Sequence, residues 1–397
     1  MSQILEVRKS YKYRLYTSKR DFRLHDSINI AGIIWNHITA LQRRYYRLFK
    51  KHISESRMKK HIAYLRMKTQ KYSYWREVGS QAVQEICERH EAAYERFFKK
   101  LGGLPKFKKV KKFRSFVLKQ AGWQLHEANS RKKYRKITIN GTVYKFIYHR
   151  PMQGDIKTVA VKRDTLGRLW LCFSVVEKMV IENTTTTGKI GGFDFGLKTF
   201  LVNDLGQEIE MPEFFKANLP RMRTIQRQVS KKQKGSMNQR EGIRHISRRH
   251  IRITDKRRDF HFKLAHLLCD YYDVLVFEDL NIAAMKMLWG RKISDLGFAQ
   301  FLDILKWVAF KHGKKLIQID RFEATTSKCS ACGEKQKIGL EERSFACKSC
   351  GVVLGRDHNA AVNILEAGHR LLLSQSIEDH SGETQKAVGA NGRSPQL

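Results

Sequence analysis

The amino-acid sequence predicts an α+β protein with more than one domain, on three observations. First, the alternation of apolar and polar residues that is typical of strands occupies residues 6–16 and 104–177. Second, apolar residues recur with a helical period over residues 23–103, between those two stretches. Third, strands and helices alternate after residue 190, and two Cys-x-x-Cys pairs interrupt this second half. We therefore expect a β domain with a helical insertion, followed by an α/β domain with a small cysteine-rich insertion.

The charge balance limits the classes of function. The 397 residues include 77 Lys and Arg against 38 Asp and Glu, which gives a formal net charge of +39. Because basic residues are spread along the whole chain, nucleic acid is the expected partner. The sequence contains no signal peptide and no apolar run long enough to span a bilayer. We expect a soluble, cytoplasmic protein with no membrane partner.

In the first half, residues 1–22 and 104–183 are predicted to form the β domain and residues 23–103 the helical domain. The helical pattern ends at Leu101-Gly-Gly-Leu-Pro105, where glycine and proline stop a helix. Later, Asn140-Gly141 stands between two alternating segments and predicts a two-residue hairpin turn.

A basic run interleaved with phenylalanine opens the second strand-rich stretch. Phe107, Phe113 and Phe116 lie among the basic residues, which suits contact with a nucleic-acid backbone and packing on bases or sugars. The alternative is a solvated charged face. The candidate nucleic-acid-binding residues are Lys106, Lys108, Lys109, Lys111, Lys112 and Arg114. A second basic region, residues 221–260, contains 14 basic residues and predicts a long helical hairpin.

One acidic side chain stands in an apolar, glycine-rich strand, Gly191-Gly-Phe-Asp-Phe-Gly196. In a strand, Asp194 points away from Phe193 and Phe195, and the neighbouring glycines leave its carboxylate uncovered. Extended stretches follow across an Asp-Leu-Gly turn, which predicts an antiparallel meander. A carboxylate on the first strand of a meander can present a divalent metal. The alternative is a surface aspartate on a hairpin.

Two later acids occupy comparable positions. Glu278 ends a continuous apolar strand, where a buried strand opens towards a ligand. Asp357 stands at the entrance to a helix that carries small apolar residues. Considered singly, Glu278 could be a helix-capping or turn acid, and Asp357 could be an N-cap.

The most specific motif is the pair Cys329-Ser-Ala-Cys332-Gly333 and Cys347-Lys-Ser-Cys350-Gly351. Two thiolate pairs, each followed by the glycine of a tight turn, are typical of zinc knuckles. Four thiolates form a closed tetrahedral site with no position for a catalytic water, so we predict one structural Zn²⁺. A redox dithiol pair is the alternative.

Considered together, Asp194, Glu278 and Asp357 are three acids that one α/β fold can bring to a single point. Three carboxylates can hold two Mg²⁺ ions about 3.5–4 Å apart, which is the arrangement that phosphodiester hydrolysis needs. We therefore predict that these three residues are catalytic and bind two Mg²⁺ ions.

The motifs around these residues resemble those of a known family. Gly192-Phe-Asp-Phe-Gly196, Phe277-Glu-Asp-Leu-Asn281, the paired cysteines and Arg356-Asp-His-Asn-Ala-Ala-Val-Asn363 are similar to the split RuvC motifs and zinc ribbon of TnpB. TnpB is the RNA-guided nuclease of insertion-sequence transposons and a relative of type V CRISPR effectors. The resemblance implies an N-terminal β wedge with an inserted helical recognition unit. A RuvC-like, RNase H-like α/β nuclease domain with an inserted zinc ribbon would follow.

On this resemblance, residues 184–324 and 352–371 form the nuclease domain, residues 325–351 the zinc ribbon and residues 372–397 a disordered tail. The family also implies a guide RNA derived from the transposon end, recognition of a short target-adjacent motif and cleavage of double-stranded DNA. A monomeric ribonucleoprotein is expected.

Two alternatives to this function stay open at the level of sequence. One is a compact type V CRISPR effector, whose guide would come from a CRISPR RNA. The other is an RNA-guided DNA-binding regulator of transposition without cleavage, in which the three acids would be structural. Because all three acids are present, a nuclease-inactive protein is disfavoured.

Overall fold

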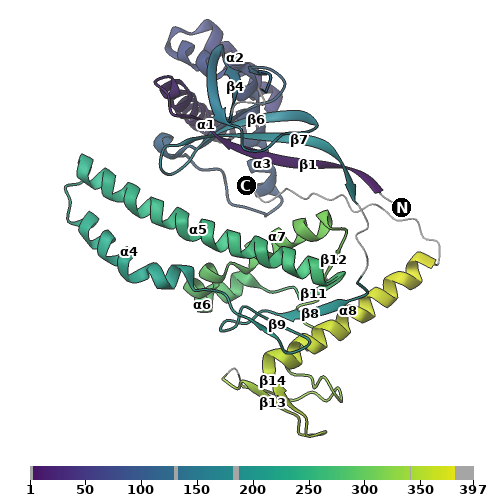
Figure 1. Ribbon diagram of the computed structural model, residues 1–397. Coiled ribbons are helices and arrows are strands. Elements are labelled where there is room, and N and C mark those ends of the chain that lie inside the picture. The colour runs from purple at the N-terminus through teal and green to yellow at the C-terminus, as the bar shows by residue number, and fades with distance from the viewer. Residues whose placement is uncertain (1–2, 129–132, 182–186, 340, 381–397) are drawn as a thin grey trace. The chain divides into compact units, whose positions relative to one another are not determined.

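The computed structural model describes residues 3–128, 133–181, 187–339 and 341–380. The chain divides into two compact units, one of residues 6–179 and one that starts at residue 180 and also includes residues 3–5 (Figure 1). The first unit combines helices with two sheets, and the second is a mixed sheet covered by helices. Within the described ranges, no helix has the length and apolar character needed to cross a membrane.

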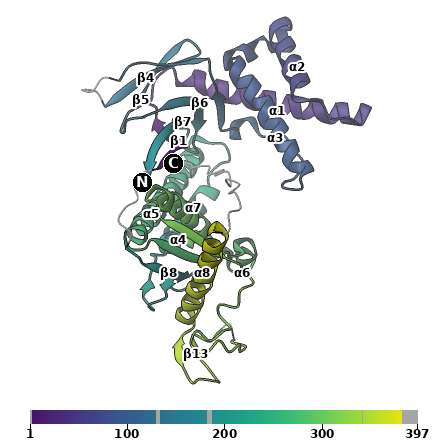
Figure 2. The ribbon, with the colours of Figure 1, turned by 90° about the vertical axis from the view of Figure 1, so that its right-hand side faces the viewer.

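The helical part of the first unit is built from consecutive elements (Figure 2). They are α1 (Asp21–Phe49), α2 (Glu55–Lys68), the 3-10 helix η1 (Gln70–Val78) and α3 (Ser80–Phe98). The helical period predicted from the sequence is buried along α1, where Leu24, Ile28 and Trp35 face the core. α1 ends where Lys50 adopts a left-handed conformation with φ 52°. The expectation of a helical stretch between two strand-rich stretches is confirmed.

The strands of the first unit form two sheets. The sheet with order β1-β7-β6-β2 contains β1 (Gln3–Arg14), β2 (Ser115–Leu118), β6 (Asp155–Arg163) and β7 (Leu169–Ile181), and the short 3-10 turn η2 (Val110–Lys112) precedes β2. The sheet with order β3-β4-β5 contains β3 (Trp123–Leu125), β4 (Tyr134–Ile139) and β5 (Thr142–Ile147). Asn140 and Gly141 join β4 to β5 with φ of 45° and 77°, which confirms the predicted two-residue turn.

One hydrophobic core connects the helices of the first unit to both sheets. Trp75 of η1, Phe116 of β2, Phe146 of β5 and Phe173 of β7 are fully buried within it. Because helices and strands share this core, they form one compact unit, and the domain boundary at residues 103–104 stays a prediction.

The second unit is organised around a five-stranded sheet of order β10-β9-β8-β11-β12. Its strands are β8 (Ile190–Asp194), β9 (Leu201–Asn203), β10 (Glu208–Ile209), β11 (Val274–Glu278) and β12 (Lys315–Ile319). β8, β9 and β10 pair antiparallel, as the predicted meander requires. β11 lies parallel to both β8 and β12, which is the pairing expected for strands separated by helices.

Helices cover both faces of this sheet, and a small hairpin precedes the last helix. The helices are α4 (Phe214–Ser230), α5 (Met237–Tyr271), α6 (Ile282–Leu296), α7 (Phe298–Lys311) and α8 (Arg356–His380), and the hairpin pairs β13 (Ser344–Ala346) with β14 (Val353–Gly355). α5 and α7 pack on the face that carries Phe193 and Phe277, and α8 packs on the opposite face against Val276 and Ile317. α4 and α5 confirm the predicted helical hairpin.

Two features of the second unit differ from the expectation. α6 was not predicted, because only Ile293, Asp295 and Leu296 are buried along it and the helix shows no continuous apolar stripe. α8 extends past residue 372, where the disordered tail was expected to begin, since Leu372 packs against the buried side chains of β11 and β12. Residues 381–397, the remainder of that expected tail, lie outside the described residues.

The approach of α8 to the sheet depends on two glycines. A Cβ on Gly192 of β8 would lie 2.4 Å from the carbonyl oxygen of Ala361, and a Cβ on Gly368 of α8 would lie 2.5 Å from Cγ2 of Val276. Both distances are shorter than van der Waals contact, so neither position accepts a larger residue unless the helix moves away from the sheet.

We predict that Gly192→Ala destabilises the protein by about 1–3 kcal/mol, because the added methyl group overpacks the interface between α8 and the sheet. Thermal or denaturant unfolding measures the change. Gly290→Ala is the matched control, since no atom lies within 4 Å of a Cβ at that helical position. Equal unfolding midpoints for the two variants would contradict the proposed constraint.

Candidate active site

Two parallel strands bring the first two predicted acids to the same edge of the sheet. Asp194 is the last residue of β8 and Glu278 is the last residue of β11. The register pairs Phe193 with Phe277, so each acid lies one residue beyond a paired position. The carboxyl ends of adjacent parallel strands are where α/β sheets bind ligands.

The alternation of side chains along a strand then sets the face on which the acids lie. The rings of Phe193 and Phe277 stack with centroids 5.1 Å apart inside the core formed with α5 and α7. Asp194 and Glu278 follow them in sequence and therefore point to the opposite face, which α8 covers. Both acids are partly exposed, whereas the two phenylalanines are buried.

α8 supplies the third acid on this face. The helix begins at Arg356, so Asp357 lies within its first turn and is not its N-cap. A Cβ on Gly196, two residues after Asp194, would lie 3.4 Å from Oδ2 of Asp357. The structure therefore brings the Asp357 carboxylate to the loop that follows β8.

His358, next to Asp357, connects the first turn of α8 to β8 through hydrogen bonds. This residue was not predicted from the sequence. Nε2 of His358 donates to the carbonyl oxygen of Asp204 at 3.1 Å. Asp204 in turn accepts a hydrogen bond from the backbone N–H of Gly192 at 3.0 Å. The turn between β9 and β10 thus links the strand of Asp194 to the helix of Asp357.

Burial and the neighbouring acids both act on the pKa of Asp194. Burial, followed by the negative charges of Asp357 and Glu278, raises the pKa of Asp194 to about 7, while the Phe195 backbone N–H and Arg356 act in the opposite direction. Burial and the nearby Asp279 also raise the pKa of Glu278, and a hydrogen bond from Thr325 opposes this rise. Like charges held together in this way favour a bound cation.

The chemistry of the donor set fits Mg²⁺, which prefers carboxylate oxygens. The carboxylates of Asp194, Glu278 and Asp357 are not among the groups of ligand atoms that lie near enough to one another to hold a single ion. Among the described residues, the four cysteines form the one group of three or more His, Cys, Asp or Glu ligand atoms near enough to hold a single metal ion.

The four predicted cysteines come together as a compact cluster. Their Sγ atoms all lie within 4.8 Å of one another. Sγ of Cys329 lies 3.7 Å from Sγ of Cys350, and Sγ of Cys332 lies 3.6 Å from Sγ of Cys347. A Zn–S bond of about 2.3 Å gives a tetrahedron whose sulfur atoms are about 3.8 Å apart, so the cluster has the size of a zinc site.

The two knuckles are built alike. Gly333 and Gly351, with φ of 80° and 73°, donate their backbone N–H to the carbonyl oxygens of Cys329 and Cys347. In the second knuckle, the N–H groups of Cys350 and Ser349 lower the pKa of the Cys347 thiol to about 6, which favours the thiolate that zinc binds. The cluster is consistent with the zinc ribbon that the sequence predicted.

The backbone of the predicted basic run, residues 106–114, is hydrogen-bonded to side chains of α1. The Trp35 indole N–H donates to the carbonyl oxygen of Lys106 at 3.2 Å, and the amide side chain of Asn36 forms two hydrogen bonds of 2.8 Å with the backbone of Lys108. All six candidate residues are exposed, namely Lys106, Lys108, Lys109, Lys111, Lys112 and Arg114. Among the described ion pairs, none neutralises these six side chains.

Two phenylalanines of this stretch, Phe113 and Phe116, differ from the expectation. Phe113 and Phe116 are buried in the core of the first unit, so they do not pack on bases or sugars, whereas Phe107 is exposed. The ammonium group of Lys108 lies 3.7 Å from the centre of the Trp35 ring, and burial lowers its pKa. The alternation of β2 explains the burial of Phe116, because alternate residues of this strand face the core. Phe113 precedes the strand and packs on α1, where a Cβ on Gly32 would lie 3.0 Å from its side chain.

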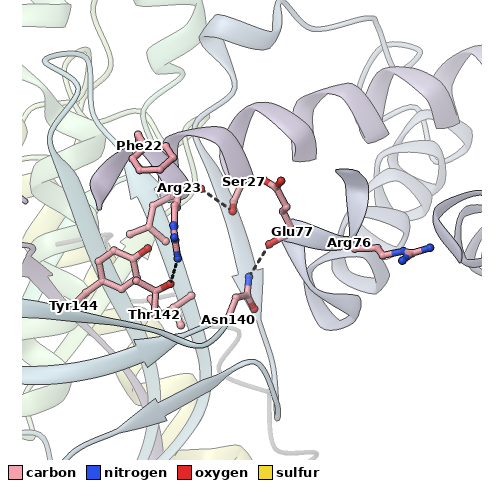
Figure 3. Close-up of a pocket in the computed structure, with 10 residues that line it drawn as sticks. Phe22, Arg23, Ser27, Arg76, Glu77, Asn140, Thr142 and Tyr144 are labelled. Carbon is pink, nitrogen blue, oxygen red and sulfur yellow. Dashed lines mark hydrogen bonds between the residues drawn. The ribbon is translucent and has the colours of Figure 1, made fainter. Parts of the chain in front are cut away.

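A polar pocket lies between the helical part and the β4–β5 hairpin of the first unit (Figure 3). It has a volume of about 470 Å³ and includes the cations Arg23 and Arg76. Arg23 donates to the Thr142 hydroxyl at 3.0 Å, and Asn140 donates to the carbonyl oxygen of Glu77 at 3.0 Å. This pocket was not predicted, because its wall combines residues 22–27, 76–77 and 139–144, which are distant from one another in the sequence.

Two family models match the chain. Residues 173–288 match the model described as "Probable transposase" (OrfB_IS605), and residues 298–364 match the one described as "Cas12f1-like, TNB domain". The first range contains Asp194 and Glu278, and the second contains the four cysteines and Asp357.

Proteins and structures similar to this chain agree with these matches. A Streptomyces pristinaespiralis protein named "Putative RNA-guided DNA endonuclease" is 29% identical over 373 residues, covering 91% of this chain and 90% of that protein. An Escherichia coli K12 protein named "Putative RNA-guided DNA endonuclease InsQ" is 27% identical over 311 residues, covering 74% of this chain and 75% of that protein. The solved structure of the mini-RNA-guided endonuclease CRISPR-Cas_phi3 gives a TM-score of 0.52 at 10% identity, covering 91% of this chain and 92% of that one.

The structural likeness concerns the fold alone, and it supports a multidomain protein of mixed helices and strands, as the predicted α+β class requires. The predicted layout of the domains stays a prediction. The resemblance to the TnpB family of RNA-guided endonucleases is confirmed by the two family models and by the named relatives.

We predict that Cys332→Ser lowers both the zinc content and the melting temperature of the purified protein, because three thiolates hold the ion less tightly than four. Elemental analysis and thermal unfolding measure the two effects. Cys172→Ser serves as the control, since Cys172 lies on β7 and outside the cluster. Absence of zinc from the unsubstituted protein would refute the site.

Proposed function

We propose that this protein is an RNA-guided DNA endonuclease that cleaves double-stranded DNA at an active site formed by Asp194, Glu278 and Asp357. The observation that carries the proposal is the convergence of these three acids, from β8, β11 and α8, on one face at the end of the sheet. The printed names of the relatives support the same class of enzyme.

In this proposal the three carboxylates hold two Mg²⁺ ions at the edge of the sheet. When bound, the ions supply charge that stabilises the attacking and leaving oxygens of phosphodiester hydrolysis. Asp194 is held by the β-sheet, Glu278 by the neighbouring strand and Asp357 by the first turn of α8. Their fixed backbones orient the carboxylates before substrate arrives, which lowers the cost of assembling the site.

The proposed nucleic-acid partners are a guide RNA, derived from the transposon end, and a target DNA duplex with a short adjacent motif. Sequence selection rests on base pairing between guide and target, while the protein binds backbone and shape. The net charge of +39 and the exposed Lys106, Lys109, Lys111, Lys112 and Arg114 support such contacts. We propose that the protein acts as a monomeric ribonucleoprotein and that its cysteine cluster binds one structural Zn²⁺.

We predict that Asp194→Ala, Glu278→Ala and Asp357→Ala each lower the cleavage rate by on the order of 10³-fold or more, because a site that lacks one ligand loses its geometry. Guided DNA binding should be nearly unchanged, since it depends on base pairing and on basic residues elsewhere. A cleavage assay with the ribonucleoprotein in Mg²⁺, together with a binding assay, measures both properties.

Asp303→Ala is the control for these three variants, because Asp303 is an exposed carboxylate on α7. Robust cleavage by any one of the three variants would remove that residue from the site. Guided binding without cleavage by the unsubstituted protein would favour a regulator of transposition. Co-purification of repeat-derived guides would favour a CRISPR effector.

We predict that Lys109→Ala and Lys112→Ala weaken nucleic-acid binding almost equally for all sequences and reduce the salt dependence by about one unit of slope per lost phosphate contact. Binding titrations over a range of salt concentrations measure this slope. Lys59→Ala is the matched control, because Glu55 and Glu88 already neutralise Lys59 at 2.6 and 2.9 Å. Unchanged slopes for the first two variants would make the run a solvated charged face.

A further inference from the structure

A buried chain of hydrogen bonds connects the first zinc knuckle to Glu278. We infer that Thr325, Asn359 and Asn363 are positioning residues, through which the docking of the cysteine cluster on α8 orients the Glu278 carboxylate. This inference rests on the proposed function, in which Glu278 is a metal ligand. None of the three side chains was a candidate on sequence grounds.

The first link is between Thr325 and the acid itself. The Thr325 hydroxyl donates to Oε2 of Glu278 at 3.3 Å, and only 4% of Thr325 is exposed. Thr325 lies in the segment of residues 320–330, which runs from the end of β12 to the first knuckle. A hydrogen bond from a buried donor limits the rotation of a carboxylate that ends a strand, because the donor itself is fixed by its surroundings.

The second link fixes the backbone of this segment on α8. Nδ2 of Asn363 donates to the carbonyl oxygens of Thr325 and Lys328, both at 2.7 Å. Asn363 is 3% exposed, so the two bonds are formed where water does not compete for the carbonyl groups. The position of Thr325 is therefore set by a side chain of the helix.

The third link reaches the cysteine cluster. Asn359, which is fully buried, donates through Nδ2 to the carbonyl oxygen of Lys328 at 2.8 Å and accepts at Oδ1 from the Ser330 N–H at 2.9 Å. Ser330 directly follows the buried ligand Cys329. Asn359 and Asn363 are four residues apart, which puts them on the same side of α8. The helix thus binds the knuckle and the Thr325 segment with adjacent side chains.

In this arrangement α8 positions two of the three acids, although only one of them lies on the helix. It presents Asp357 directly from its first turn, and it fixes Glu278 through Asn363 and Thr325. Two further contacts hold the same segment at the surface, between Lys328 and Glu366 at 3.0 Å and between Arg370 and Glu323 at 2.6 Å. Exposed pairs of this kind contribute little to stability, so they provide matched controls.

The test compares Thr325→Val, which keeps the shape of the side chain and removes the hydroxyl, with Thr325→Ser, which restores the donor. We expect Thr325→Val to raise the Mg²⁺ concentration for half-maximal cleavage and to lower kcat by about tenfold, with unchanged KM for DNA. Thr325→Ser should return both quantities towards those of the unsubstituted protein. Zinc content and melting temperature should be the same in all three proteins, which separates positioning from a loss of structure.

Binding of Mn²⁺ by the ribonucleoprotein, followed by electron paramagnetic resonance, gives a second readout that does not require cleavage. We expect Thr325→Val and Asn363→Ala each to weaken Mn²⁺ binding about tenfold. The double variant should be little worse than either alone, because both changes break the same link. Arg370→Gln, which breaks only a surface pair, should bind Mn²⁺ normally.

The outcomes separate this inference from the proposed function. If the unsubstituted protein binds Mn²⁺ but cuts no DNA, the proposed function fails, and the Mn²⁺ affinities still decide the inference. Normal Mn²⁺ binding and normal Mg²⁺ dependence in Thr325→Val would overturn it. Additive losses in the double variant, or a failure of Thr325→Ser to restore binding, would also overturn it, as would the absence of any Mn²⁺ binding.

Discussion

The close contact between α8 and the central sheet is the constraint on which the second unit depends. Gly192 and Gly368 lack the Cβ atoms that would separate the helix from the strands, so the backbone of α8 lies directly on β8 and β11. That contact brings Asp357 to the loop after Asp194 and places Asn359 and Asn363 against the segment that leads to the cysteine cluster. One packing interface therefore positions both the acids and the zinc-ribbon motif.

The three candidate acids stand in contrast to the rest of the chain. A protein of net charge +39 concentrates three carboxylates on one face of a sheet, where burial and mutual repulsion raise the pKa of Asp194. Repulsion of this kind destabilises the isolated fold, and a bound divalent cation relieves it. In the proposed function, this negative cluster binds metal ions and the exposed lysines of the first unit bind phosphate groups.

Local patterns in the sequence were sufficient for the cysteine cluster and for the strand ends that carry Asp194 and Glu278. The spacing of two cysteines within a few residues is enough to identify a zinc knuckle. The last residue of an apolar run marks the end of a buried strand. Sequence could not predict α6, whose exposed residues form no stripe, or the burial of Phe113 and Phe116 within a lysine-rich run. The sequence also could not predict Thr325 and Asn363, because their proposed role depends on contacts between residues that are tens of positions apart in the chain. The convergence of the three acids was predicted only by considering the three together. Their catalytic role stays a prediction.

The position of α8 late in the chain has a consequence for protein synthesis. The ribosome makes β8, β11 and β12 first, and these strands can pair before Asp357 has emerged. Until α8 is complete, Gly192 and Val276 have no helix to cover them, and Glu278 lacks the segment that fixes it. A nascent chain that stops before residue 356 therefore carries two of the three acids and lacks the complete site that the proposed function requires.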